Sequence, residues 1–274
     1  MVIATLEDAF ACPIITFFLI VHHMDVSTIS NHCFFYITSL FFEFLVTKLL
    51  ITSGVNSVMT SYVSQSEVLE LTSNNGSQCP NWIDMNLKGS TGGLLDKPLI
   101  CGGIFLDNST SDWCFSIINQ DSKNVTKMLV KRAFATSIVL NEDTLWISGG
   151  FDEDNGLIHA SSEFIHLDNT ILGPELPRPS HRHAMVMIAS DLTMVVGGLS
   201  SNGTNGSNRT YYFDHNAQTW TDGPILLIGR HAHAASAIID VVTKETIVIV
   251  TGGFSNQSLD STEILLDDKW TRGK

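Results

Sequence analysis

The chain has 274 residues and a net charge of −13, from 15 basic and 28 acidic residues. Proteins that bind nucleic acid need clustered Lys and Arg side chains, and the sequence has no basic run, so the composition argues against that function. The acidic residues are spread along the chain, which is typical of a soluble surface.

Residues 1–47 differ in composition from the rest of the chain. They hold an apolar run, Ala9–Val21, and a longer one, Cys33–Ile51, that approaches the roughly 20 residues of a membrane span. The first charges are acidic, and no small-residue cleavage site follows, unlike a typical signal peptide. Three interpretations stay open for this hydrophobic leader: a signal or anchor segment, a buried strand, or an artefact of where the coding region was drawn. Any membrane contact is expected only through residues 1–47.

Two short apolar runs in the middle of the chain predict a β-hairpin. Ala184–Ala189 and Leu192–Val196 flank the polar pair Ser190-Asp191, and both are rich in residues that favour strands. Gly197-Gly198 follows directly. Paired glycines allow positive φ and a close approach of two backbones, so we expect a structural turn there.

The same succession of hairpin and glycine pair recurs along the chain. The other copies end at Gly102-Gly103, Gly149-Gly150 and Gly252-Gly253, and a weaker copy ends at Gly54. The last glycines of the copies are 49, 47, 48 and 55 residues apart. A period near 50 residues that is built from strands predicts a repeat array. Its units cover about 48–85, 89–128, 132–176, 178–224 and 230–274.

The units continue with a polar loop, a third strand that opens with Ser or Thr, and a fourth strand that carries an aromatic anchor in three of them. The anchors are Trp82, Trp220 and Trp270. This order of features resembles the kelch repeat over about residues 48–274. The resemblance implies an all-β fold, a kelch-type β-propeller of about five four-stranded blades. No strand to complete the last blade is evident, so we expect an incomplete or imperfectly closed ring from a longer protein.

Five cysteines are present, and no Cys-x-x-Cys motif. On the kelch layout Cys101 and Cys114 lie on neighbouring strands, which makes them the candidate disulfide. The alternative is two free buried thiols, and the compartment decides between the two.

Asn-x-Ser/Thr triplets, the acceptors of N-linked sugar, are frequent in the predicted loops. They begin at Asn75, Asn108, Asn124, Asn202, Asn205, Asn208 and Asn256. Such triplets accept sugar only in the secretory pathway, so they favour a secreted or membrane-associated protein that faces the exterior. A cytoplasmic location is the alternative.

Four histidines are the best metal candidates: His181, His183, His231 and His233. Each His-x-His pair places two imidazoles on one face of a strand, and imidazoles suit zinc or copper. We favour a structural role and predict no metal and no cofactor, because neither a carboxylate nor a Cys completes a ligand set. Asp152–Asp154 could hold a hard cation such as calcium, but no further ligands are evident.

A repeat array with variable loops favours a non-catalytic interaction module whose partner is a protein or a glycan. The first alternative is an intracellular kelch adaptor that binds actin or ubiquitin-ligase substrates and lacks its BTB domain. The second alternative is a metal-dependent enzyme on a propeller scaffold.

Overall fold

The computed structural model describes residues 48–55, 62–70, 87–96, 98–118, 121–200, 205–239, 243 and 245–273. The predicted leader, Trp82, Asn75 and Asn202 lie outside these residues. Strands are the only regular secondary structure that is described, so the all-β prediction is confirmed. Within the described ranges there is no helix long and apolar enough to span a membrane.

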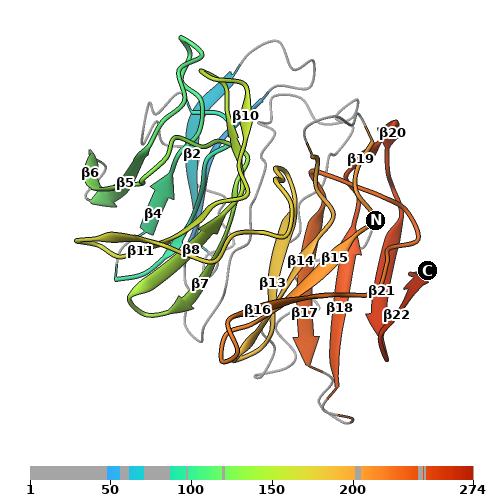
Figure 1. Ribbon diagram of the computed structural model, residues 1–274. Helices are drawn as coiled ribbons and strands as arrows, with labels where there is room; N and C mark the ends of the chain where they lie inside the picture. Colours follow the sequence, from blue (N-terminus) through green and yellow to red (C-terminus); the bar gives the residue numbers. More distant parts are fainter. Residues whose placement is uncertain are drawn as a thin grey trace.

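Four antiparallel sheets of four strands each follow one another along the chain (Figure 1). The first sheet contains β3 (Thr91–Leu94), β4 (Pro98–Cys101), β5 (Trp113–Ile118) and β6 (Asp121–Lys127). The second contains β7 (Thr136–Asn141), β8 (Thr144–Ser148), β11 (Ser162–Ile165) and β12 (Thr170–Leu172). The third contains β13 (Ala184–Ala189), β14 (Leu192–Val196), β15 (Thr210–Asp214) and β16 (Thr219–Asp222). The fourth contains β17 (Ala234–Ile239), β18 (Thr246–Thr251), β21 (Thr262–Leu266) and β22 (Lys269–Arg272).

Shorter pairs complete the described strands. β1 (Lys48–Val55) pairs with β2 (Tyr62–Glu70) near the start of the described chain. β9 (Phe151–Asp152) pairs with β10 (Leu157–Ile158), and β19 (Phe254–Ser255) with β20 (Gln257–Ser258). The predicted hairpin is confirmed, because β13 and β14 have the expected limits and pair antiparallel.

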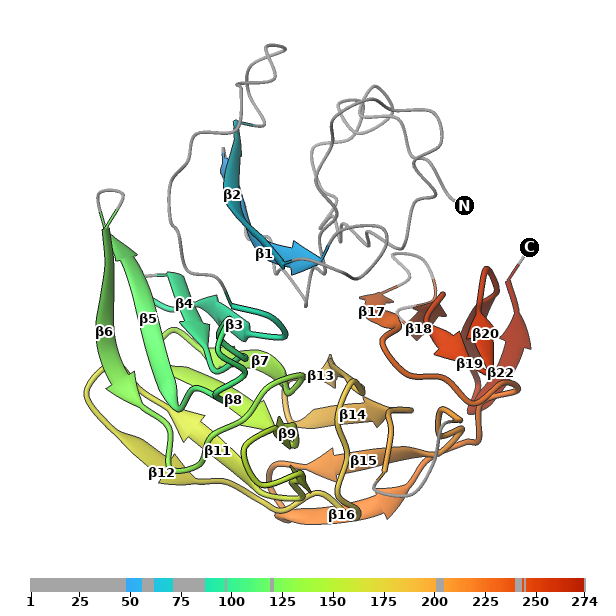
Figure 2. The ribbon, with the colours of Figure 1, turned by 90° about the horizontal axis from the view of Figure 1, so that it is seen from above.

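The four sheets stand side by side in an arc (Figure 2). In each sheet the first strand is innermost and the fourth is outermost, and the inner strands β3, β7, β13 and β17 contact one another in that order. The chain therefore builds the arc one sheet at a time.

The hydrophobic core lies between the sheets. Leu99 of the first sheet packs in one cluster with Leu145 and Ile147 of the second. Trp146 of the second sheet packs with Met185 and Phe213 of the third. A further cluster, which includes Val196, Val250 and Trp270, joins the third sheet to the fourth. Each sheet buries its apolar face against its neighbours, so the array is the unit of stability.

The glycine pairs are the points where one sheet meets the next. The second glycine of three pairs donates a 2.9 Å backbone hydrogen bond to the carbonyl of a residue four positions before the next inner strand: Gly103 to Arg132, Gly150 to Ser180, and Gly198 to Arg230. The first glycine of each pair has φ between +62° and +65°, and a Cβ on it would overlap the same carbonyl. Gly252 and Gly253 also have positive φ. Side chains are excluded here because two backbones touch.

A second contact between sheets runs along the inner strands. Gly89, Phe134, Arg182 and Ala232 occupy equivalent positions, two residues before the inner strands, and all have φ between +50° and +71°. The amide of Phe134 donates to the Gly89 carbonyl, that of Arg182 to Phe134, and that of Ala232 to Arg182, over 2.6–2.8 Å. Three of the four are not glycine, so this backbone chain holds them in a conformation that costs about 1 kcal/mol or more at each residue.

Replacing Gly149 by Ala tests the importance of the close approach between sheets. The new Cβ would overlap the Ser180 carbonyl and press on the His183 ring, so we expect the free energy of unfolding to fall by about 2 kcal/mol or more. The matched control is Gly156→Ala, because Gly156 has φ +64° but no atom within 4 Å of its Cβ position. Urea unfolding of both variants measures the difference, and equal losses would contradict the role given to the junction.

Candidate functional site

The four candidate histidines lie at the start of the inner strands of the third and fourth sheets. His183 is buried, and its Nε2 lies 3.0 Å from Ser148 Oγ of the second sheet. His181 packs against Phe151, with ring centroids 5.6 Å apart, and His231 packs against Phe254 at 5.5 Å. A Cβ on Gly197 would meet the His233 ring. In the described part of the chain, no group of three or more His, Cys, Asp or Glu side chains is placed to hold a metal ion.

Burial keeps the imidazoles of His181, His183 and His231 neutral at physiological pH. It lowers the pKa of His183 to about 3, with a smaller contribution from His181. It also lowers the pKa of His181 and His231 to about 4, and the Arg182 guanidinium adds to the effect at both. The buried His183 ring thus packs between the third sheet and the second, against Ser148.

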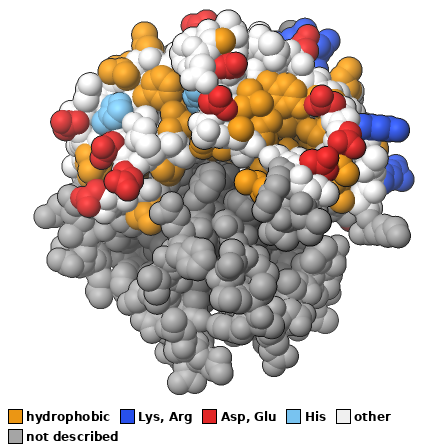
Figure 3. Space-filling model, turned by 90° about the horizontal axis from the view of Figure 1, so that it is seen from below, with side chains coloured by type: hydrophobic (Ala, Val, Ile, Leu, Met, Phe, Trp, Pro, Cys, Tyr) orange, Lys and Arg blue, Asp and Glu red, His pale blue; other side chains and the backbone are white. Residues whose placement is uncertain are grey.

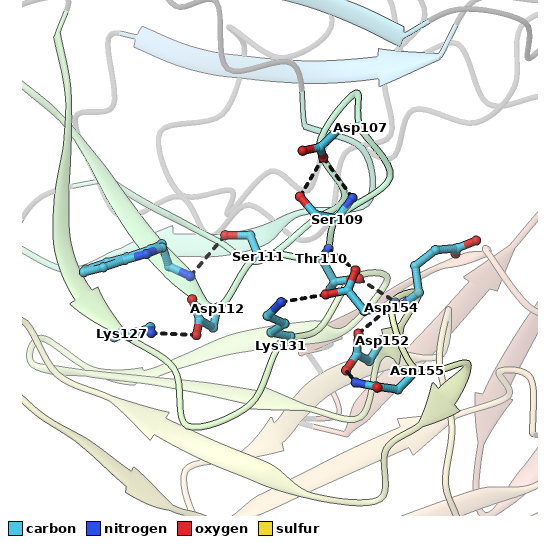
Figure 4. Close-up of polar contacts among 12 residues, drawn as sticks. Asp107, Ser109, Thr110, Ser111, Asp112, Lys127, Lys131, Asp152, Asp154 and Asn155 are labelled. Atoms are coloured by element: carbon cyan, nitrogen blue, oxygen red, sulfur yellow. Dashed lines mark hydrogen bonds and ion pairs between the residues drawn. The ribbon is translucent and has the colours of Figure 1, made fainter.

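The acidic loop after Gly150 joins the second sheet to the first (Figure 4). The carboxylate of Asp154 accepts the Thr110 amide at 3.0 Å and the Lys131 ammonium at 2.6 Å. The Glu153 amide in turn donates to Thr110 Oγ1 at 2.9 Å. Asp152 accepts the Asp154 amide and the Asn155 side-chain amide, which fixes the turn. The hydrogen bond from Lys131 is the main cause that lowers the pKa of Asp154. In the loop that we considered for a hard cation, the Asp154 carboxylate thus links two sheets and the Asp152 carboxylate stabilises the turn.

Cys101 and Cys114 lie directly opposite each other on β4 and β5, with their sulfur atoms at disulfide distance. Both are buried. The same position in the ladder pairs Ser148 with Ser162 in the second sheet, Val196 with Thr210 in the third, and Thr251 with Thr262 in the fourth. A cross-link fits this position because the other sheets also place small side chains opposite each other there.

The predicted anchors Trp220 and Trp270 lie on the outermost strands of the third and fourth sheets. Trp270 is buried, and its indole N–H donates to the Pro224 carbonyl at 2.9 Å. Trp220 is half-buried, 4.9 Å from Phe213 between ring centroids. Sequence reasoning missed Trp146 of β8, which is fully buried between the second and third sheets and donates to Ser162 Oγ at 2.8 Å.

It also missed two buried ion pairs. Arg132 binds the Glu163 carboxylate at 2.6 Å and the Ser161 carbonyl at 2.9 Å, and Arg230 makes the same contacts with Glu263 at 2.6 Å and Ser261 at 3.0 Å. All four charged side chains are fully buried. Each Glu also accepts hydrogen bonds from two backbone amides of the segment that leads into its sheet. Each ion pair therefore fixes that segment to the sheet. The sequence signal that could have predicted these ion pairs is the joint presence of Arg and Glu at equivalent positions of two repeat units.

The third sheet replaces both partners at once. Equivalent backbone bridges follow Arg132, Ser180 and Arg230, so these three residues occupy the same position in their repeat units. The strand pairing likewise places Tyr211 of the third sheet at the position of Glu163 and Glu263. Removing one member of a buried ion pair leaves an uncompensated charge, which costs about 3–5 kcal/mol. The paired change to Ser and Tyr avoids that cost.

The sheet ends form two faces. We define the lower face as the turns that join first to second strands and third to fourth strands. Those of the third and fourth sheets lie at the bottom of Figure 1. The upper face is made by the turns that follow the glycine pairs and by the links between sheets. Asn108, Asn205, Asn208 and Asn256 lie exposed on the upper face, and Asn124 lies exposed on β6. The described sequons outside β6 therefore share one face.

Carboxylates dominate the lower face. The acidic residues in its turns are Asp96, Glu142, Asp143, Asp168, Asp191, Asp214, Glu245, Asp267 and Asp268. Lys269 is the only Lys or Arg that the structure describes in these turns, while Lys97 and Lys244 lie outside the described residues. The upper face mixes both signs, with ion pairs of Lys127 with Asp112 and of Lys131 with Asp154. Acidic residues thus occur on both faces, as expected of a general surface acidity, and the lower face differs in having few described basic residues beside them.

A scan against protein-family models found no match to the chain, and a search of the curated proteins found none either. The resemblance to kelch repeats rests on the residues of the chain alone.

Lowering the pH should destabilise the protein through the buried histidines. The pKa of His183 is about 3 in the folded chain and about 6.5 in the unfolded chain, so between these values the unfolded chain binds more protons. The neutral His183 makes its full contribution to the free energy of unfolding above about pH 6.5. This free energy falls by about 2 kcal/mol between pH 7 and pH 5. Urea unfolding at both pH values measures the loss. His183→Gln should reduce it, and an unchanged pH dependence would contradict the assignment.

The buried ion pair can be tested by transferring the pair of the third sheet to the second. Arg132→Ser and Glu163→Tyr should each lower the free energy of unfolding by about 3 kcal/mol or more, because each leaves one buried charge. The double variant should lose less than either single variant. Additive losses in the double-mutant cycle would show that the two positions are not coupled.

Proposed function

We propose that the chain forms a kelch-type β-propeller that acts as a non-catalytic protein-interaction module. The observation that carries the proposal is the arc of four-stranded sheets, joined through their inner strands, with turns exposed on two faces (Figure 2). The turns lie at the ends of the sheets, outside their packed faces, so they can present a contact surface while the sheets keep their packing.

Several features support the propeller. The inner strand, the glycine pair and the cross-strand position that holds Cys101 and Cys114 recur in the same order in every sheet. Backbone hydrogen bonds at Gly89, Phe134, Arg182 and Ala232 link successive sheets in one direction around the arc. The β1–β2 pair joins the second and third strands predicted for the first repeat unit, so it supplies half of a further blade.

We further propose that the chain is a secreted or membrane-tethered protein that faces the exterior. The disulfide pair of the first sheet supports this location, because disulfides persist in oxidising compartments. The exposed acceptors Asn108, Asn208 and Asn256 support it as well, because only the secretory pathway attaches sugar to such triplets.

Expression of the whole chain in a secreting eukaryotic cell tests the location. We expect a glycoprotein whose mass falls after treatment with an N-glycosidase, and Asn108→Gln with Asn256→Gln should remove part of that shift. A cytosolic product without sugar would contradict the location and favour the intracellular adaptor instead.

Binding of the purified secreted chain to intact cells tests the interaction function. We expect saturable binding that is lost when the cells are treated with protease, since the proposed partner is a protein. Loss after glycosidase treatment of the cells alone would identify a glycan partner. Binding that does not saturate on any cell type would contradict an interaction module.

A further inference from the structure

The lower face holds like charges from all four sheets close to one end of the molecule. Carboxylates at the same end repel one another and destabilise the compact state. The two surface ion pairs between described residues lie on the upper face, where Lys127 meets Asp112 and Lys131 meets Asp154. The lower face therefore has an excess of negative charge. Lys269 is the one described cation in its turns that offsets part of this charge.

Contacts between neighbours hold several of these carboxylates in place. The Asn216 side-chain amide donates to the Asp191 carboxylate at 2.8 Å, and one Asp214 oxygen accepts the amides of Asn216 and Ala217 at 2.8 Å each. The Tyr212 hydroxyl donates to the Asp268 carboxylate at 3.2 Å, which links the third sheet to the fourth. A carboxylate of the fourth sheet is thus fixed at the surface by a side chain of the third sheet.

Exposed aliphatic side chains accompany the carboxylates on the fourth sheet. Ile238, Ile239 and Leu266 are 38%, 65% and 38% exposed, at the end of the sheet that also carries Glu245 and Asp267. Figure 3, which views the molecule from below, shows hydrophobic side chains gathered between Asp and Glu side chains, with Lys and Arg at the margin of the described surface. An apolar patch with a charged rim is typical of a protein-binding surface.

We propose that the lower face of the third and fourth sheets binds a basic protein segment that also presents aliphatic side chains. The proposal rests on the interaction function above and names its face and the chemistry of its partner. Lys and Arg of the partner would relieve the repulsion among the carboxylates, and its aliphatic side chains would cover Ile238, Ile239 and Leu266. The opposite face mixes charges and carries the sequons, and sugars there would leave the lower face open.

The test measures binding of a synthetic peptide of alternating Lys and Leu to the secreted whole chain, with a peptide of alternating Glu and Leu for comparison. One variant neutralises the lower face by Asp191→Ser, Glu245→Gln, Asp267→Asn and Asp268→Asn. The matched control neutralises the upper face by Asp107→Ser, Glu153→Gln, Glu175→Gln and Asp260→Ser. Both sets remove the same number of exposed charges, and neither creates a new Asn-x-Ser/Thr triplet.

We expect the wild type to bind the Lys-Leu peptide and not the Glu-Leu peptide. The dissociation constant should rise at least about tenfold in the lower-face variant and less than about twofold in the control, and salt should weaken the binding. Equal effects of both sets, no binding by the wild type, or binding that requires added calcium would overturn the proposal.

Cell binding by the same variants separates this proposal from the interaction function. If the lower-face variant loses cell binding and the control keeps it, both stand. If the control loses cell binding and the lower-face variant keeps it, the interaction function stands and the assignment of its face is wrong.

Discussion

The contact between a glycine pair and the carbonyl of the next unit is the constraint on which the array depends. It brings two backbones close enough that a Cβ at Gly102, Gly149 or Gly197 would overlap the carbonyl oxygen. This close approach places the inner strands side by side, which in turn brings the apolar faces of adjacent sheets together. The His183 ring fills the remaining space beside Gly149, and its burial accounts for its low pKa.

Around these fixed junctions the units differ in a coordinated way. The cross-strand position is a disulfide pair in the first sheet, two serines in the second, and a threonine pair at 2.9 Å in the fourth. The buried Arg and Glu are present together in the second and fourth sheets and replaced together in the third. Residues that touch change in pairs, because a buried donor or charge left alone would be costly.

Some turns also carry contacts between sheets. On the upper face the acidic loop at Asp152–Asn155 holds two sheets together, and the sequons occupy neighbouring turns. On the lower face the turns carry carboxylates whose mutual repulsion gives no benefit to folding. This excess of negative charge is one of the observations behind the partner that we propose for the lower face.

The sequence by itself determined the local order of the fold. Short apolar runs and the glycine pairs predict the strands β13 and β14 and the turn that follows, because these depend on residues close together in one repeat. The resemblance to the kelch repeat implied the neighbouring positions of Cys101 and Cys114, which the strand pairing places opposite each other. Only the tertiary structure showed that Trp146 is buried between sheets. It revealed that Arg132 and Arg230 form buried ion pairs with Glu163 and Glu263. It also showed that carboxylates far apart in the chain share one face. These features depend on which sheet ends and strand faces come together, and that is decided by packing between repeats, which no periodicity within a single repeat contains.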